Sequence, residues 1–265
     1  MEAENRMEGY LRSLSGSLPE RLRRMEAEAL AEYVPIIRRQ TQEFLRFLLR
    51  MKRPERILEL GTAVGFSGNF IAEYMPENAE LLTVEKVPMR IVKAKVNLAS
   101  SPHANRIRML TGDALQVLRA LNGKEPESSI GIYYPGGKPG TAEAQEPFRG
   151  YPMQNDQPDG WLDDIYEWNA SGKEDAFDLI FLDAAKAQYM SYLPEILELM
   201  RPDSILVTDN ILQEGSVADS KFSIPRRDRT IHMRMREYLY EITHCAALDT
   251  VLLKEGDGIA LSRRR

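Results

Sequence analysis

The sequence predicts an α/β protein whose core is a doubly wound, mostly parallel, seven-stranded sheet. Short apolar runs alternate with helical stretches from residue 56 onward, a pattern typical of parallel strands joined by helices. Helical patterns precede the first strand, and two last apolar runs flank Glu255-Gly-Asp-Gly258, which indicates an antiparallel C-terminal hairpin. The 265 residues are expected to form a single domain over 1–265.

The N-terminal region, residues 1–52, predicts helices. Pro19 and Glu20 suit the first turn of one helix. The apolar stripe within 44–49 indicates another, and Pro35 breaks the pattern between them because proline lacks the amide hydrogen that a helix needs.

The remaining elements follow from the spacing of apolar residues. The predicted parallel strands are Ile57–Leu60, Leu81–Val84, Ile107–Leu110, Leu179–Leu182 and Ile205–Thr208. The predicted helices are Ser67–Tyr74, Pro88–Ala99, Leu115–Leu121, Tyr189–Met200 and Arg229–Ile242. The hairpin pairs Thr250–Lys254 with Ile259–Ser262, which brings the predicted strands to seven.

An acidic insert over 122–176 interrupts this alternation of predicted strands and helices. It holds eight of the 17 glycines and six of the 15 prolines, a composition typical of loops. It also holds both tryptophans, and purely disordered segments are poor in aromatic residues. Trp161, Ile165 and Trp168 could share one helical face, so we expect part of the insert to fold back on the body, as a functional lid or as decoration.

The composition is that of a soluble protein. No apolar run approaches the roughly 20 residues that span a bilayer, so no membrane partner is expected. The N-terminus is charged throughout and lacks the apolar stretch of a signal peptide, so none is predicted. Cys245 is the only cysteine, which excludes an internal disulfide. A cytoplasmic location is therefore expected.

Asp183 and the pair Asp209-Asn210 each close an apolar strand. Residues just past the carboxyl ends of parallel strands share one edge of the sheet, where ligands bind. Two carboxylates and an amide oxygen suit Mg²⁺, which prefers oxygen ligands. Each carboxylate alone would equally suit a loop or a helix cap, so only the joint pattern indicates metal.

The loop Gly61-Thr-Ala-Val-Gly-Phe-Ser67 follows a strand and opens a helix. Its spacing matches neither a dinucleotide fingerprint nor a phosphate-binding Walker loop. It suits a small ligand with an amino-acid moiety, whose carboxylate Ser67 and the helix N-terminus could bind. The alternative is a tight turn that binds nothing.

Two more polar positions lie in register with this loop. Glu85 ends the second strand, where an acidic side chain can accept the hydroxyls of a ribose. Gly112-Asp113-Ala114 ends the third strand, where an adenine ring would lie. Glu85 alone could be a solvated strand end, but the three together favour an adenosyl ligand.

These residues resemble a known family, the class I S-adenosylmethionine-dependent O-methyltransferases of the catechol and caffeoyl-CoA type, which have a Rossmann-like fold. The resemblance covers about residues 33–262 outside the insert. The motifs that carry it are Leu58-Glu-Leu-Gly-Thr-Ala-Val-Gly-Phe-Ser67, Glu85, Gly112-Asp-Ala114, Phe177-Asp-Leu-Ile-Phe-Leu-Asp-Ala-Ala-Lys-Ala-Gln-Tyr189 and Asp209-Asn210.

The resemblance implies roles for individual residues. Asp183, Asp209 and Asn210 would bind Mg²⁺ or Mn²⁺, and Asp183 would also contact the amino group of the methyl donor. Lys186 would act as the general base. The residues implied in binding S-adenosylmethionine are Ile37, Gly61, Ser67, Glu85, Asp113, Ala114 and Asp183. Relatives also suggest a homodimer.

Within the family, the chain looks most like the bacterial tRNA 5-hydroxyuridine methyltransferases. Two passages of sequence carry this resemblance, residues 224–236 and residues 249–262. That resemblance implies methylation of the 5-hydroxyl at the tRNA wobble position, giving 5-methoxyuridine. The alternative is a catechol or caffeoyl-CoA type enzyme acting on a small phenol, which the aromatic insert favours slightly. A third hypothesis is a non-catalytic nucleotide-binding or RNA-binding module, against which the complete residue set argues.

An arginine cluster supplies candidates for RNA contact. The insert holds eleven acidic and four basic residues, so the rest of the chain, with 29 acidic and 31 basic residues, carries a net charge of +2. Arginine suits phosphate contact and base stacking, although such a cluster is often only a solvated face. The candidates are Arg226, Arg227, Arg229 and Arg234, with Arg236 beyond them. The histidines lie outside the metal motifs, and we expect surface or packing positions for them.

Overall fold

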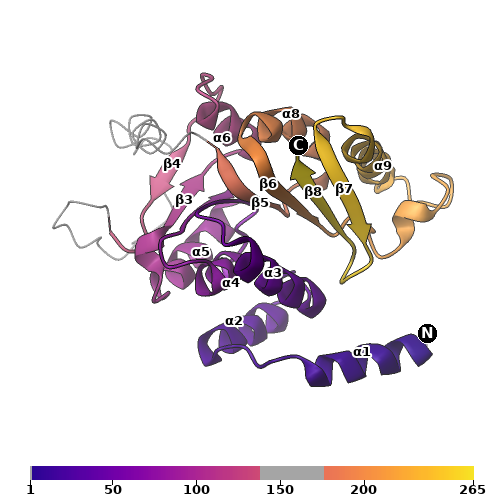
Figure 1. The fold of residues 1–265 in the computed structure, drawn as a ribbon, viewed down its shortest axis with the longest axis horizontal. Helices are drawn as coiled ribbons and strands as arrows, with labels where there is room; N and C mark the ends of the chain where they lie inside the picture. Colours follow the sequence, from indigo (N-terminus) through magenta and orange to yellow (C-terminus); the bar gives the residue numbers. More distant parts are fainter. Residues whose placement is uncertain (1, 138–175) are drawn as a thin grey trace.

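The computed structural model describes residues 2–137 and 176–265, and it forms one sheet flanked by helices (Figure 1). The strand order is β4-β3-β2-β1-β5-β6-β8-β7. Strands β3, β2, β1, β5 and β6 are parallel, whereas β4, β8 and β7 pair antiparallel with their neighbours. The strands are β1 (Arg56–Leu60), β2 (Glu80–Glu85), β3 (Ile107–Thr111), β4 (Gly131–Tyr133), β5 (Phe177–Leu182), β6 (Met200–Asp209), β7 (Leu248–Leu253) and β8 (Ile259–Arg264).

The predicted mostly parallel α/β fold with a C-terminal hairpin is confirmed, but the number of strands was wrong. Among the described residues the sheet has eight strands, because Gly131–Tyr133 pairs with β3 inside the region assigned to the insert. Three half-buried residues are too few to show a strand periodicity, so β4 could not be predicted from the apolar pattern. The predicted helical face of Trp161, Ile165 and Trp168 lies outside the described residues.

The predicted helices are present with small shifts at their ends. They are α2 (Glu20–Ala31), α3 (Arg39–Lys52), α4 (Phe66–Tyr74), α5 (Pro88–Ala99), α6 (Ala114–Leu121), α8 (Tyr189–Glu198) and α9 (Arg229–His244), and α1 (Glu2–Leu14) is a further helix within the region predicted to be helical. Pro35 lies between α2 and α3, where the break was predicted. Asp113 caps α6, since its carboxylate accepts a hydrogen bond from the backbone N–H of Leu115.

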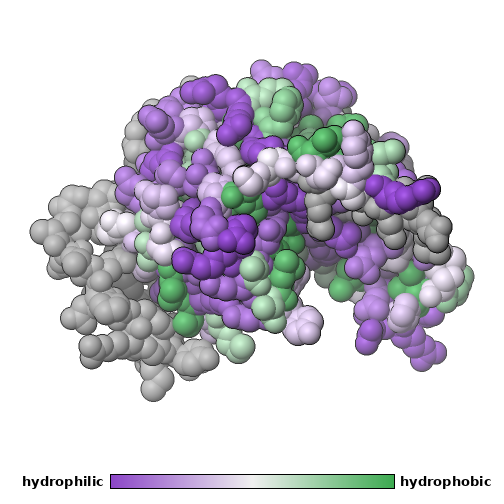
Figure 2. Space-filling model, turned by 90° about the horizontal axis from the view of Figure 1, so that it is seen from below, coloured by the Kyte–Doolittle hydropathy of each residue, from purple (hydrophilic) through white to green (hydrophobic). Residues whose placement is uncertain are grey.

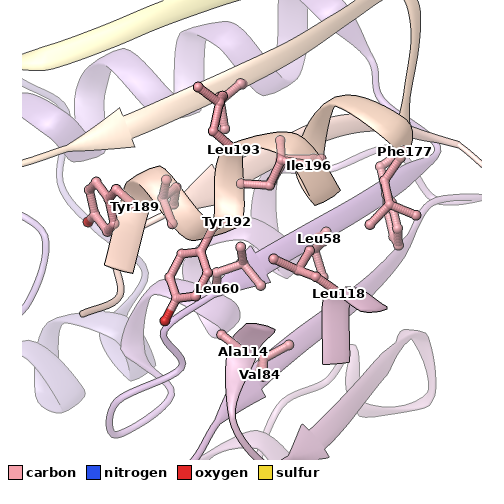
Figure 3. Packing of buried hydrophobic residues seen from close by; sticks show 14 of the residues in the cluster. Leu58, Leu60, Val84, Ala114, Leu118, Phe177, Tyr189, Tyr192, Leu193 and Ile196 are labelled. Atoms are coloured by element: carbon pink, nitrogen blue, oxygen red, sulfur yellow. The ribbon is translucent and has the colours of Figure 1, made fainter. Parts of the chain in front are cut away.

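The two faces of the sheet form two apolar layers. Strand side chains alternate in direction, so Leu58 and Leu60 join α6, α8 and α9 in one layer, whereas Ile57 joins α2, α3, α4 and α5 in the other. Figure 3 shows Tyr189 and Tyr192 of α8 packed over the first layer. Both layers pack against the strands whose carboxyl ends carry the loops described below.

Helices α2 and α3 lie on the lower side of the molecule, and α1 extends away from the sheet (Figure 1). On that side, hydrophilic residues are interspersed with hydrophobic ones (Figure 2). Within the described ranges, no helix has the length and apolar character to cross a bilayer.

Candidate active site

A cavity of about 560 Å³ lies at the carboxyl ends of the parallel strands. This is the edge where ligands bind in open α/β sheets. The segment before α3 closes one side. The residues lining the cavity include Pro35, Ile36, Arg38, Gly61, Ala63, Glu85, Arg90, Gly112, Ala114, Asp183, Lys186, Tyr192, Asn210, Glu214 and Asp257. The structure therefore brings together the strand-end residues that the sequence singled out.

The turn after β1 depends on a glycine. Gly61 has φ +109°, and a Cβ atom on it would lie 2.1 Å from the carbonyl oxygen of Asp183. Its backbone N–H donates to the carbonyl of Val84 at 3.0 Å. Because the loops after β1 and β5 approach so closely, no larger residue fits there. This contact holds the backbone of Asp183 against the turn.

Glu85 is held in one orientation on the cavity wall. Its Oε2 accepts from the backbone N–H of Ala63 at 2.9 Å. Its Oε1 accepts from the N–H groups of Lys86 and Val87, at 2.9 and 2.8 Å. A carboxylate has about four acceptor sites, so Oε2 still has a lone pair for a ligand hydroxyl.

Three predicted cofactor residues lie beside the cavity wall instead of in it. Ile37 is buried in the core, and its neighbours Ile36 and Arg38 line the cavity. Asp113 caps α6 and contacts Lys86 at 3.1 Å, while Gly112 and Ala114 form the wall. A helix cap needs its carboxylate close to the backbone, which draws Asp113 away from the cavity.

Ser67 is also turned away from the predicted carboxylate of the ligand. It is buried, and its hydroxyl contacts the carboxylate of Glu59. Glu59 is fully buried in β1, where Thr83 also donates to it. Burial raises the pKa of Glu59 to about 7, and the hydroxyls of Ser67 and Thr83 offset only part of that rise. A carboxyl inside an apolar strand needs hydrogen-bond donors near it. The place of Glu59 between Leu58 and Leu60 could therefore have predicted that nearby hydroxyls bond to it.

We expect Glu59→Gln to weaken the pH dependence of stability. The pKa of Glu59 is raised from 4.5 to about 7, so the folded protein holds the proton more tightly than the unfolded chain. The resulting stability is complete below the unfolded pKa and is lost as pH rises to about 7, a loss of about 3 kcal/mol at most. Urea unfolding on both sides of this window measures the loss, which should be smaller in Glu59→Gln than in the wild type. The exposed Glu77→Gln is the control, and equal losses in all three proteins would contradict the assignment.

The predicted metal ligands and Lys186 meet at one end of the cavity. The Nζ atom of Lys186 lies 3.3 Å from Oδ1 of Asn210 and 3.9 Å from Oδ1 of Asp183. Asn210 has a left-handed φ of 56°, which asparagine tolerates better than most residues. The short 3-10 helix Lys186–Gln188 places Lys186 one turn after Asp183.

Asp209 completes this group from a fully buried position. Its Oδ1 accepts from the backbone N–H of Asn210 at 2.8 Å and from the hydroxyl of Thr41 at 3.3 Å. Its Oδ2 is buried without a hydrogen-bond partner. Burial, followed by the nearby charge of Asp183, raises the pKa of Asp209 to about 7. Burial likewise raises the pKa of Asp183, despite Lys186 and Arg90.

These properties suit a hard divalent cation. The carboxyl of Asp209 is fully buried and that of Asp183 is half-buried, both have raised pKa values, and one oxygen of Asp209 has no hydrogen-bond partner. Across 2–137 and 176–265, no group of three His, Cys, Asp or Glu side chains could hold a metal. The third donor here would be the amide oxygen of Asn210, and an all-oxygen set of this kind suits Mg²⁺ or Mn²⁺.

The predicted RNA-binding arginines are mostly engaged within the protein. Arg229 donates from Nε to the carbonyl of Ile224 at 2.9 Å. Arg227 pairs with Asp228 at 3.3 Å, and Arg234 pairs with Glu237 at 3.4 Å. Arg226 is exposed in the loop before α9. None of the four lines the cavity of about 560 Å³.

The sequence matches the model of one protein family. A family model described as O-methyltransferase matches residues 13–134 and 161–265. The chain belongs to the O-methyltransferase family. It is therefore an S-adenosylmethionine-dependent O-methyltransferase, as the motifs predicted. The match omits 135–160, which lie within the predicted insert over 122–176.

Individual relatives agree with this family. The chain is 25% identical to a catechol O-methyltransferase of Niastella koreensis over 83% of this chain and 78% of that one. It is 25% identical to a catechol O-methyltransferase of Mycobacterium tuberculosis, over 84% and 78%. It is also 34% identical to caffeoyl-CoA O-methyltransferase 1 of Eucalyptus globulus, over 39% and 41%.

Solved structures share the fold of the O-methyltransferase. An S-adenosylhomocysteine-bound methyltransferase of Podospora anserina superposes with a TM-score of 0.72 at 20% identity, covering 100% of this chain and 96% of that one. The O-methyltransferase of Streptomyces achromogenes involved in tomaymycin synthesis, solved with S-adenosylmethionine, gives 0.68 at 22% identity, covering 100% and 99%. At these identities the likeness establishes the fold.

Proposed function

We propose that the enzyme methylates one hydroxyl of a small phenol with two adjacent oxygens, using S-adenosylmethionine and a divalent cation, Mg²⁺ or Mn²⁺. The observation that carries this proposal is the meeting of Lys186, Asp183 and Asn210 at the edge of the cavity, beside the orphaned oxygen of Asp209. A catechol presents two oxygens that could share one cation at this point.

The cavity would hold the methyl donor. Glu85 would accept hydrogen bonds from the ribose hydroxyls, and the wall at Gly112 and Ala114 would cover the adenine. The tight turn at Gly61 lets backbone approach the methionine moiety closely. These residues would hold and orient the donor in the cavity that Lys186 also lines.

Asp183, Asp209 and Asn210 would hold the cation. When bound, it supplies a fixed template for the two acceptor oxygens and stabilises negative charge on the reacting one. A cation there would also offset the negative charge of the two carboxylates.

Lys186 would serve as the general base. Its Nζ would take the proton from the acceptor hydroxyl, and the resulting oxyanion would be the nucleophile for the methyl group. The oxygen–methyl bond forms as the sulfur–methyl bond breaks, and the sulfonium becomes a neutral thioether. Holding both reactants in line replaces an encounter in solution, which lowers the barrier by several kcal/mol.

Methylation of tRNA hydroxyuridine is less well supported than methylation of a small phenol. The named relatives act on catechol or caffeoyl-CoA, and three of the four candidate arginines already bond within the protein. A non-catalytic module fits less well, because the candidate catalytic set is complete. The homodimer and the cytoplasmic location stay predictions.

A substrate comparison tests the proposed function. The purified enzyme is given labelled S-adenosylmethionine, Mg²⁺ and either catechol or tRNA carrying 5-hydroxyuridine. We expect labelled catechol, with the label lost when EDTA removes the metal. Labelled tRNA with unlabelled catechol would overturn the small-molecule assignment.

A further inference from the structure

Thr41 connects an N-terminal helix to one of the candidate metal ligands. It lies in the first turn of α3, and its side chain is fully buried. Its Oγ1 lies 3.3 Å from Oδ1 of Asp209, which ends β6 at 168 residues further along the chain. An ionised carboxylate can only accept, so the hydroxyl donates this bond. The bond therefore joins two segments that meet only in the folded protein.

The two oxygens of the Asp209 carboxylate have different surroundings. Oδ1 accepts from the hydroxyl of Thr41 and from the backbone N–H of Asn210 at 2.8 Å, which fills the two acceptor sites of that oxygen. Oδ2 is buried and has no hydrogen-bond partner in the parts of the chain that the structure describes. One oxygen is thus bonded to the protein, and the other keeps its lone pairs for a ligand.

The hydroxyl of Thr41 restricts the rotation of this carboxylate. With the N–H of Asn210 as its only donor, the carboxylate could turn about its Cβ–Cγ bond and exchange its two equivalent oxygens at the cost of one hydrogen bond. Thr41 adds a donor from a separate segment, so that the exchange would break two bonds. Hydrogen-bond partners of this kind orient metal ligands and strengthen metal binding.

The surroundings of Thr41 direct its hydroxyl to Asp209. A threonine in a helix commonly bonds to the carbonyl one turn before it. Here that carbonyl belongs to Ile37, and it accepts from Nε2 of Gln42 at 3.0 Å. The turn between β7 and β8 packs against the hydroxyl, because a Cβ atom on Gly256 would lie 2.7 Å from Oγ1. Gly256 has φ +66°, which glycine adopts without strain.

We infer that Thr41 is a positioning residue for the divalent cation: its hydroxyl fixes the carboxylate of Asp209 so that Oδ2 is kept for the metal. Thr41 acts only through Asp209 and contacts neither the cation nor the substrate. This role rests on the proposed function, because the cation is the one proposed there.

Two substitutions separate positioning from packing. Thr41→Val keeps the shape of the side chain but removes the hydroxyl, whereas Thr41→Ser keeps the hydroxyl and removes a methyl group. A threonine that only packs would tolerate Val better than Ser. The matched control is Thr208→Val, which removes another fully buried hydroxyl. Thr208 precedes Asp209 in β6, but its hydroxyl bonds to that of Tyr238 at 2.7 Å.

The measurement is the dissociation constant of Mn²⁺ for the donor-free protein, obtained from the electron paramagnetic resonance signal of free Mn²⁺. We expect this constant to rise about tenfold in Thr41→Val and to change less than about threefold in Thr41→Ser and Thr208→Val. Thermal unfolding reports the folding of each variant. If Thr41→Val does not fold, Thr41→Ala also lacks the hydroxyl and should show the same rise.

Binding of S-adenosylhomocysteine without metal, measured by calorimetry, is the second measurement. Thr41 does not line the cavity proposed for the donor, so this dissociation constant should change less than about threefold in every variant. If Thr41 instead held the whole N-terminal segment in place, Thr41→Val would weaken S-adenosylhomocysteine as much as it weakens Mn²⁺, and the positioning role would be wrong.

Other results would also overturn the role of Thr41. An unchanged Mn²⁺ constant in Thr41→Val, or an equal rise in Thr41→Ser or Thr208→Val, rejects it while the proposed cation site stands. A wild-type protein that binds no Mn²⁺ rejects the cation site of the proposed function, and the role of Thr41 falls with it.

Discussion

Lys186→Met is expected to lower kcat by about 10² to 10⁴, the usual contribution of a positioned general base. Methionine keeps most of the length and packing of lysine but cannot take a proton. Lys186 Nζ is the one amine placed within 4 Å of both Asn210 and Asp183 in the described chain, at 3.3 and 3.9 Å. Affinity for S-adenosylmethionine should change far less than kcat.

Single-turnover kinetics and donor-binding calorimetry measure the two effects of Lys186→Met separately. Lys124→Met is the matched control, since Lys124 pairs with Glu195 and Glu198 on α8 and does not line the cavity. If Lys186→Met kept more than about a tenth of the wild-type kcat, Lys186 would not be the base.

Asp209→Asn should lower activity by at least about 100-fold, because a lost ligand weakens a site that stabilises developing charge. The variant should also lose the rise in melting temperature that Mg²⁺ gives the wild type, since a ligand that binds the folded state stabilises it. Without metal, the variant should be more stable than the wild type above about pH 7, where the wild-type carboxyl ionises in a buried position.

Differential scanning calorimetry with and without Mg²⁺ checks the stability effects of Asp209→Asn. Asp203→Asn removes an exposed carboxylate that pairs with Arg263 and serves as the control. An equal Mg²⁺-dependent shift in Asp209→Asn and the wild type would show that the cation binds elsewhere.

The sequence predicted the core elements because their signals are local. Alternating apolar runs placed β1, β2, β3 and β5 within two residues at each end, whereas β6 begins five residues before its predicted start at Ile205. The motif residues Asp183, Asp209 and Asn210 converge because consecutive parallel strands deliver their ends to one edge. Strand β4 was missed because three residues carry no periodic pattern.

Side-chain direction was harder to predict than position. Ser67 and Ile37 lie in the expected segments, but the buried carboxyl of Glu59 engages the first and the core encloses the second. His232 was expected at a surface or packing position, and it is indeed buried on α9, with its Nε2 3.2 Å from the carbonyl oxygen of Asp219. Such facts depend on contacts between distant segments, which single-sequence patterns do not report.

The most direct test of the metal site is a crystal of the enzyme with Mn²⁺ and S-adenosylhomocysteine, measured for anomalous scattering. We predict one manganese peak bounded by Asp183, Asp209 and Asn210, at oxygen distances of about 2.0–2.3 Å. Methyl transfer that persists in EDTA, together with density showing no peak among these three side chains, would contradict the account.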